Sequence, residues 1–279
     1  MEQEILRKLQ LAQLEIAKEI RRVCEENHIR YFLCCGSFLG AVRHQGFIPW
    51  DDDLDIGMLR EDYERFCRIA PEKLNPEYCV QSWYTDPRYA LPFAKVRKRG
   101  TLLLERKSIH LEENGIYVDV FPFDNAPRDA AEQNKLARKL VTYFRIKLMK
   151  SGMRPWMEND RIVWVKRIGF IPYQLLSLLG SHEKWIDCFE KAARSVPAGE
   201  ILCRQRAWSK LDCYDRAWCE DLASYPFEGE QFPGPRDYDA FLTSIFGDYM
   251  TLPPEGTRED RHQIVRLDFG DGTEEWVAK

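Results

Sequence analysis

Residues 36–55 read Gly-Ser-Phe-Leu-Gly-Ala-Val-Arg-His-Gln-Gly-Phe-Ile-Pro-Trp-Asp-Asp-Asp-Leu-Asp, and this stretch decides the fold that we expect. It joins a turn of small residues to a dense cluster of acids. A small-residue turn lets the backbone approach a phosphate, and clustered carboxylates can hold a divalent cation. Phosphoryl transfer needs both features side by side. The stretch therefore predicts a phosphate- and metal-binding site.

The acids at the end of this stretch predict a metal site together with a third acid further along the chain. Asp53 and Asp55 lie in a segment that alternates acidic and apolar residues, so a strand would place both on one face. Asp119, in Tyr-Val-Asp-Val-Phe, has the same pattern and would lie about 5 Å across the ladder if the two strands pair. All-oxygen ligands favour one or two Mg²⁺ or Mn²⁺ ions. Asp51 and Asp52 are expected to support the site rather than to ligate.

The Gly-Ser turn is the expected phosphate site. Gly36 permits close backbone approach, and Ser37 adds a hydroxyl donor. Ser37 is also expected to cap a short helix that runs through Val42, whose first amides would face the phosphate. Arg43 is expected to contact phosphate or to order the acidic loop.

Hydrophobic periodicity predicts the order of the elements. Strands are expected near residues 29–35, 53–58, 78–83, 92–96, 101–104 and 116–121, helices near 3–27, 60–69 and 237–246, helical periods over 128–195, and loops at 227–235 and 251–257. The pattern indicates an α/β (α+β) fold, in which a mixed β-sheet core has flanking helices and a helical extension. We divide the chain into a catalytic core (1–127), a mainly helical extension (128–225) and a C-terminal segment that packs back on the core (226–279).

Composition excludes some classes of protein. The 279 residues carry a net charge of −4, which does not suggest a nucleic-acid binder, and nine cysteines without a C-x-x-C pattern indicate reduced structural thiols rather than a zinc site. Residues 128–167 hold 11 Lys or Arg against 4 Asp or Glu. Such a basic stretch fits an anionic polymer or a membrane surface, or else a solvated helix face.

The apolar stretch 161–180 has two interpretations. It is too short, and too broken by Pro172, to cross a membrane. Its mixture of aromatic, aliphatic and basic residues suits an interfacial helix, but a buried helix is the preferred interpretation. The N-terminus lacks the apolar core of a signal peptide. We expect a cytoplasmic protein, with peripheral contact to the inner face of the membrane through 128–180 as an open alternative.

The motifs together resemble a known family. Residues 35–56 resemble the signature of the LicD family, which includes fukutin-related sugar-phosphate transferases. Residues 116–124 resemble its later acidic strand, and 227–254 its C-terminal block. The resemblance implies a nucleotidyltransferase-like fold, in which Asp53 and Asp55 match the metal-binding pair and Asp119 the third acid by context.

The resemblance also implies a reaction. Family members transfer phosphocholine or a related phospho-alcohol from a CDP-linked donor, such as CDP-choline, to a glycan of the cell-surface polysaccharide, lipopolysaccharide or teichoic acid type, and release CMP. One of the three acids, Asp119 by preference, would accept the proton of the acceptor hydroxyl. Lys95 and Arg97 would neutralise the donor diphosphate, with a surface ion pair as the alternative. Glu228 and Arg258 are considered as residues that close the site or bind the acceptor.

Two rival functions stay open at this point. The chain could transfer a nucleotidyl group and release pyrophosphate, because the same fold permits both reactions. It could also be a non-catalytic nucleotide- or glycan-binding protein. The sequence leaves open which alcohol is transferred, and whether the glycan acceptor is soluble or lipid-linked.

Overall fold

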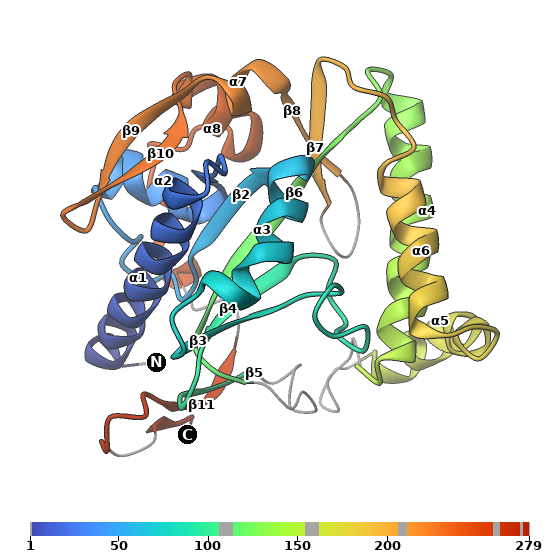
Figure 1. Ribbon diagram of the computed structural model, residues 1–279, viewed down its shortest axis with the longest axis horizontal. Coiled ribbons are helices and arrows are strands. Elements are labelled where there is room, and N and C mark those ends of the chain that lie inside the picture. The colour runs from blue at the N-terminus through green and yellow to red at the C-terminus, as the bar shows by residue number, and fades with distance from the viewer. Residues whose placement is uncertain are drawn as a thin grey trace.

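The fold is organised around a mixed sheet with helices packed beside it and a helical extension at one edge (Figure 1). The computed structural model describes residues 2–105, 114–153, 162–205, 211–258, 263–273 and 276–278. The helices are α1 (Gln3–Glu26), α2 (Cys35–His44), α3 (Arg60–Lys73), α4 (Ala130–Lys150), α5 (Val163–Ser177), α6 (His182–Ala193), α7 (Arg216–Glu220) and α8 (Tyr238–Phe246). The strands are β1 (Phe32–Leu33), β2 (Asp55–Leu59), β3 (Tyr78–Gln81), β4 (Ala94–Lys98), β5 (Leu102–Glu105), β6 (Tyr117–Asn125), β7 (Ile201–Gln205), β8 (Leu211–Asp215), β9 (Leu222–Phe227), β10 (Glu230–Pro235), β11 (Ile264–Asp268) and β12 (Trp276–Val277).

The main sheet has the strand order β1-β2-β6-β4-β3 within the described residues. Strands β2 and β6 run parallel, whereas β1, β4 and β3 pair with their neighbours in antiparallel fashion. Strand β7 pairs with the end of β6 and carries β8. A separate hairpin joins β9 to β10, and β11 connects β12 to β5. This arrangement confirms the expected α+β fold with a mixed sheet.

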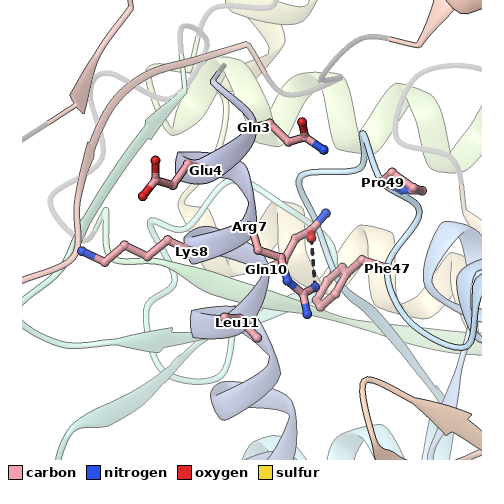
Figure 2. Close-up of a pocket in the computed structure, with 8 residues that line it drawn as sticks. All are labelled: Gln3, Glu4, Arg7, Lys8, Gln10, Leu11, Phe47 and Pro49. Atoms are coloured by element: carbon pink, nitrogen blue, oxygen red, sulfur yellow. Dashed lines mark hydrogen bonds between the residues drawn. The ribbon is translucent and has the colours of Figure 1, made fainter.

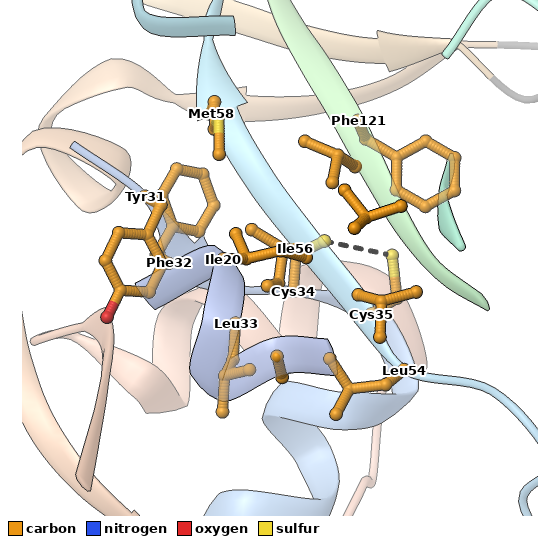
Figure 3. Packing of buried hydrophobic residues seen from close by; sticks show 14 of the residues in the cluster. Ile20, Tyr31, Phe32, Leu33, Cys34, Cys35, Leu54, Ile56, Met58 and Phe121 are labelled. Carbon is orange, nitrogen blue, oxygen red and sulfur yellow. Dashed lines mark hydrogen bonds between the residues drawn. The ribbon is translucent and has the colours of Figure 1, made fainter. Parts of the chain in front are cut away.

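Alternation along the central strands separates an apolar face of the sheet from a polar one. Ile56, Val118 and Val120 are fully buried in the main hydrophobic core, together with Ile20 of α1. Figure 3 shows Ile20, Leu54 and Ile56 in this cluster. Successive side chains of a strand point to opposite faces, so the residues between these apolar positions lie on the other face. That polar face carries the acids.

The amphipathic N-terminal helix forms as its spacing predicts, because its apolar residues recur every three or four positions. Leu9, Ile16 and Ile20 of α1 are fully buried. Burying a leucine or isoleucine side chain contributes about 1.5–3 kcal/mol, so this face attaches α1 firmly to the core. All nine cysteines carry free thiols, and Cys34 and Cys35 lie within the same core (Figure 3).

Two local predictions were wrong. Helix α2 begins at Cys35, three residues earlier than expected, and Cys34 rather than Ser37 occupies its N-cap position. Residues 227–235, expected as a loop, form the hairpin of β9 and β10. Its Gly and Pro content misled the prediction, because an isolated two-stranded ribbon tolerates proline along its edges. The turn Glu228-Gly229 has φ angles of 54° and 79°, which suits a tight hairpin.

The helical extension has its own hydrophobic cluster, in which α4 and α6 pack together through Leu140, Phe144 and Phe189. The apolar stretch that begins at Arg161, itself outside the described residues, forms α5. The preferred interpretation of a buried helix was wrong, because only Ser177 of α5 is buried. Across the described parts of the chain, we find no helix that combines the length and apolar character needed to cross a membrane.

The extension leaves and rejoins the sheet at a single place. Strand β6 ends at Asn125, which pairs with Leu202 of β7. Helices α4, α5 and α6 lie between these two paired residues in sequence. The division into three segments at 127 and 225 stays a prediction.

Candidate active site

A row of polar side chains crosses the polar face of the main sheet. Asp55 of β2 pairs with Asp119 of β6, which pairs with Lys95 of β4, and Lys95 pairs with Gln81 of β3. The expected pairing of the two acid-bearing strands is therefore confirmed. Lys95 Nζ lies 2.7 Å from Asp119 Oδ1, and both side chains are 6% exposed. This ion pair is buried, so the alternative of a surface ion pair does not hold for Lys95.

Asp55 lies beside this ion pair in a more repulsive environment. Burial raises the pKa of its carboxyl well above the ordinary value, and the negative charges of Asp53 and Asp119 raise it further. The Asp55 backbone N–H donates to Ser37 Oγ at 2.8 Å, which ties the start of β2 to helix α2. A buried carboxyl that is surrounded by other acids is well suited to hold a cation.

The acidic loop before β2 gathers three more carboxylates. Oxygens of Asp51, Asp52 and Asp53 lie within 4.8 Å of one another, the one such group of acids, histidines or cysteines among the described residues. Strand β2 begins only at Asp55, so Asp53 belongs to this loop rather than to the strand. The structure thus offers Asp51 and Asp52 as further oxygen donors, whereas the sequence-based interpretation gave them a supporting role.

Helix α1 holds the acidic loop through its buried amides. Gln10 Nε2 donates to the carbonyl oxygen of Asp51 and Gln13 Nε2 to that of Asp52, both at 2.9 Å. Gln10 and Gln13 are almost completely buried. Net hydrogen-bond contributions of about 1 kcal/mol each fix the course of the loop.

The hairpin turn between β9 and β10 holds the residues before the acidic loop. Glu228 accepts a hydrogen bond from the Phe47 backbone N–H at 3.0 Å, and its carboxylate pairs with Arg7. The hydrogen bond from Arg7 lowers the pKa of Glu228, with a smaller contribution from Phe47. Glu228 therefore has a structural partner on either side, and it positions residue 47 rather than facing the acids.

The Gly-Ser turn meets the acidic loop directly. A Cβ atom added to Gly36 would lie 2.6 Å from Asp51 Oδ2, so only glycine lets this carboxylate approach the first turn of α2. Helix N-termini carry a partial positive charge that attracts anions. The predicted phosphate-binding residues Gly36 and Ser37 thus lie next to the acids, as their order in the sequence suggests.

Arg43 lies at the opposite end of α2 from the Gly-Ser turn. Its Nη1 donates to the Tyr249 carbonyl oxygen at 2.6 Å, and its Nε to His44 Nε2 at 3.0 Å. Burial lowers the pKa of Arg43, and the neighbouring guanidinium of Arg258 lowers it further. Arg258 also lies 5.0 Å above the ring of Trp50, the residue before the acidic loop. These side chains form a second, cationic cluster beside the acids.

Arg97 makes structural contacts next to the polar row. Its Nε donates to Gln81 Oε1 at 2.9 Å and its Nη1 to the Gly115 carbonyl oxygen at 2.8 Å. Arg97 is 4% exposed. The expected role of Arg97 at a donor diphosphate stays a prediction.

Arg204 is a charged residue of this region that the sequence-based interpretation missed. Its guanidinium, on β7, pairs with Asp212 at 2.8 Å and lies 5.0 Å above the Phe121 ring. The charges of Cys35 and Asp55 help to raise its pKa. Its Nε is buried without a hydrogen-bond partner among the described residues. The available signal was one arginine within the apolar run Ile-Leu-Cys-Arg.

An open groove of about 830 Å³ lies on the outer side of helix α1 beside the acidic loop (Figure 2). Its lining comprises Gln3, Glu4, Arg7, Lys8, Gln10, Leu11, Phe47 and Pro49. Gln10 connects this groove to the acids, because its side chain also bonds the Asp51 carbonyl oxygen. The accessible surface of its lining is mainly apolar, and its cations Arg7 and Lys8 already pair with Glu228 and Asp271.

The amino-acid sequence is similar to those of known proteins. Residues 28–156 match the sequence model of the LicD/FKTN/FKRP nucleotidyltransferase domain. The chain is 28% identical to the lipopolysaccharide cholinephosphotransferase LicD of Haemophilus influenzae over 94% of its own length and 97% of that protein. It is 48% identical to the human ribitol 5-phosphate transferase FKRP over 39% of its own length and 20% of that protein. An uncharacterised Rickettsia typhi protein is 44% identical over 24% of this chain and 22% of its own length.

Proposed function

We propose that this chain, whose residues 28–156 match the sequence model of the LicD/FKTN/FKRP nucleotidyltransferase domain, is a phosphotransferase that moves phosphocholine or a related phospho-alcohol from a CDP-linked donor to a glycan. The observation that carries the proposal is the row of Asp55, Asp119 and Lys95, which lies next to the Gly-Ser turn and the acidic loop. Two relatives are named as transferases of phosphorylated alcohols, one of cholinephosphate and one of ribitol 5-phosphate.

The acids fit a divalent cation by their chemistry. The carboxylate oxygens of the acidic loop lie within 4.8 Å of one another, and burial beside like charges raises the pKa of Asp55. A cation would relieve this repulsion, and an all-oxygen donor set favours Mg²⁺ or Mn²⁺. We infer that Asp53, Asp55 and Asp119 are its ligands, with Asp51 and Asp52, which lie beside Asp53 in the acidic loop, as further oxygen donors. When bound, the cation would stabilise negative charge on the reacting phosphoryl group and on the leaving CMP.

The side chains of the row divide the remaining work. The acceptor hydroxyl attacks the phosphorus that carries the alcohol, and the bond from this phosphorus to the CMP oxygen breaks. Asp119 takes the hydroxyl proton, and Lys95 holds this carboxylate in place through their 2.7 Å contact. The backbone at Gly36 and Ser37 binds the donor diphosphate, with Arg97 contributing positive charge, while Arg43, at the other end of α2, takes the alternative role of ordering the acidic loop.

The groove on helix α1 is the proposed position of the glycan acceptor. Its amide side chains can hydrogen-bond sugar hydroxyls, and it adjoins the acidic loop through Gln10. We infer no nucleic-acid partner. The acceptor glycan is lipid-linked or soluble, and the groove accommodates the sugar portion in either case.

A product assay tests this proposal. The full chain is incubated with CDP-choline, Mg²⁺ and a glycan acceptor, and CMP and pyrophosphate are measured together with phosphocholine on the glycan. Asp53→Ala should reduce turnover by at least about 10³-fold without unfolding the protein, because one repulsive acid is removed. Asp187→Ala, at an exposed acid of α6, is the control. Release of pyrophosphate instead of CMP, or normal turnover by Asp53→Ala, would contradict the proposal.

A further inference from the structure

Helix α5 presents its most apolar stripe to solvent. Trp164, Ile168, Ile171, Leu175 and the C-cap residue Leu178 follow one another at spacings of four and three, so they share one face of the helix. Their side chains are between 48% and 74% exposed. Val165, Leu176 and Leu179 flank this stripe and are also exposed. We call these eight residues the α5 stripe.

The opposite face of α5 packs against α4. Arg145 of α4 donates to the Tyr173 hydroxyl at 3.2 Å and lies 5.5 Å above the ring of Phe170. Ser177, on the same face, is the buried residue of the helix. The helix is therefore docked on the extension through its more polar face. A helix on the surface of a soluble domain has the reverse orientation, with its apolar face inward.

Cations flank the α5 stripe at both ends. The Arg167 guanidinium lies 5.1 Å above the Trp164 ring at the N-terminal end. Lys184 Nζ donates to the Leu179 carbonyl oxygen at 2.9 Å at the C-terminal end. Both contacts place a positive charge at the border of an apolar surface. Lys and Arg side chains at a membrane interface have the same arrangement, with the stem on the apolar layer and the charge at its polar boundary.

Helix α5 and the adjoining C-terminal part of α4 contain no acidic residue. Residues 138–150 of α4 and 163–177 of α5 hold seven Lys or Arg and no Asp or Glu. The connecting residues 151–162 carry two residues of each sign and add no net charge. An exposed aromatic and aliphatic face, on a helix whose own charged residues are all cations, is typical of helices that lie in the interface of an anionic membrane.

We propose that α5 docks this protein on the surface of a lipid bilayer that contains anionic lipids. The α5 stripe enters the boundary between headgroups and acyl chains, while Arg167 and Lys184 contact lipid phosphates. The charge pattern favours this occupant over a second copy of the chain, because self-association through the stripe would bring the bordering cations together. The proposal does not depend on the transferase activity, and it explains the large apolar surface of a helix that cannot span a membrane.

Vesicle sedimentation tests the proposal with the full chain. The probes are vesicles of phosphatidylcholine alone and vesicles with one part phosphatidylglycerol to about two parts phosphatidylcholine. The wild type should bind the anionic vesicles and leave them at high salt. The double variant Ile168→Glu/Leu175→Glu should lower the partition coefficient by about tenfold or more. The reason is that two apolar side chains are lost from the face of α5 that enters the bilayer. Both positions are exposed, so the variant should retain the wild-type circular dichroism and melting temperature.

A matched control uses an exposed leucine outside both the α5 stripe and the α1 groove. Leu252 is 45% exposed, and Leu252→Glu should bind anionic vesicles as the wild type does. The variant Arg167→Gln should weaken binding to anionic vesicles more than to neutral ones. Wild-type protein that stays in the supernatant with both vesicles, or a double variant that sediments like the wild type, would overturn the proposal. The proposal would also be overturned if the wild type does not bind vesicles but forms a dimer in analytical ultracentrifugation, and the double variant does not form this dimer.

Discussion

Asp55 and Asp119 face each other across the parallel strands β2 and β6, yet only Asp119 has a buried ammonium group beside it. Lys95 compensates the charge of Asp119 at 2.7 Å, whereas burial and neighbouring acids raise the pKa of Asp55. The two carboxylates therefore differ in how much they gain from an added cation. This asymmetry leads to the first two predictions.

Asp55→Asn should make the metal-free protein more stable at neutral pH. The raised pKa means that the folded state holds a proton that the unfolded state releases, so this group costs stability as the pH rises above the ordinary carboxyl pKa. The variant should gain about 1–2 kcal/mol in unfolding free energy at pH 8 and much less at pH 4. Urea denaturation in EDTA measures this difference. Added Mg²⁺ should stabilise the wild type more than the variant, and turnover should be lost.

Lys95→Met should destabilise the fold, because Asp119 would remain buried without its counterion. Breaking a buried pair from one side costs about 3–5 kcal/mol. The double variant Lys95→Met/Asp119→Asn should recover most of this stability but no turnover. Lys98→Met, at the half-buried end of the same strand, is the control and should change stability little. A double variant as unstable as the single one would show that Lys95 acts through packing alone.

Arg204→Gln should lower turnover by about 10²-fold, because a buried guanidinium near Asp55 can stabilise charge that develops on the phosphoryl group. Its buried Nε, without a partner in the described structure, offers a donor to a ligand oxygen. Loss of the ion pair with Asp212 also costs stability, so Asp212→Asn serves as the control. That control should be destabilised to a similar degree while keeping most of its turnover. Equal loss of turnover in both variants would assign Arg204 a structural role only.

Glu228→Gln should loosen the acidic loop and lower stability by about 1–2 kcal/mol, since a charge-assisted contact to Arg7 is lost. The hydrogen bond from Arg7 depresses the pKa of Glu228 in the folded state. Its contribution is therefore present at neutral pH and disappears as the pH falls through the folded-state pKa. Thermal melts should show a difference from the wild type at pH 7 that shrinks as the pH falls toward 3. Glu230→Gln, in the same hairpin, removes an ion pair with Arg21 but no contact to Phe47, so it is the control for effects that are specific to the acidic loop.

Lys147→Met should stabilise the helical extension near pH 7. Burial lowers the pKa of Lys147 from 10.5 to about 7, so between these values the unfolded chain binds a proton that the folded chain does not. Stability from this group therefore rises with pH across that interval, and the advantage of the methionine variant should shrink toward pH 10. The Tyr89 carbonyl that accepts from Lys147 keeps a bond from Trp83 Nε1 at 2.9 Å. Denaturation at pH 6.5 and 9.5 measures the effect, expected at about 1–2 kcal/mol, with Lys150→Met as a neutral control.

The centre of the site was predictable because its pattern is local. Each acid-bearing strand alternates acidic and apolar residues, which places Asp55 and Asp119 on one face and their neighbours in the core. The Gly-Ser turn and the acidic loop follow each other in sequence, so their contact at Gly36 required no distant information. Lys95 was expected to neutralise the donor diphosphate, and its buried pairing with Asp119 depends on the register of β4.

The remaining parts depend on contacts that no local pattern encodes. Arg204 reaches the site because β7 pairs with the end of β6, across the whole helical extension. Helix α5 was predictable as an apolar helix, but periodicity alone does not say whether its apolar stripe faces inward or outward. Arg43 was expected near the turn, yet the length of α2 carries it to the other end of that helix. In each case, tertiary packing decided what the sequence left open.

The pairing of Asn125 with Leu202 makes residues 126–200 a long insertion between two adjacent strands of one hairpin. Because the insertion starts and ends at neighbouring points, closing it costs little more entropy than a shorter loop would. Under the proposal that α5 docks on a bilayer, substitutions in α5 would alter membrane attachment while the strands of the main sheet keep their register. Attachment and chemistry can diverge separately in evolution, and the same sheet can serve acceptors in different surroundings.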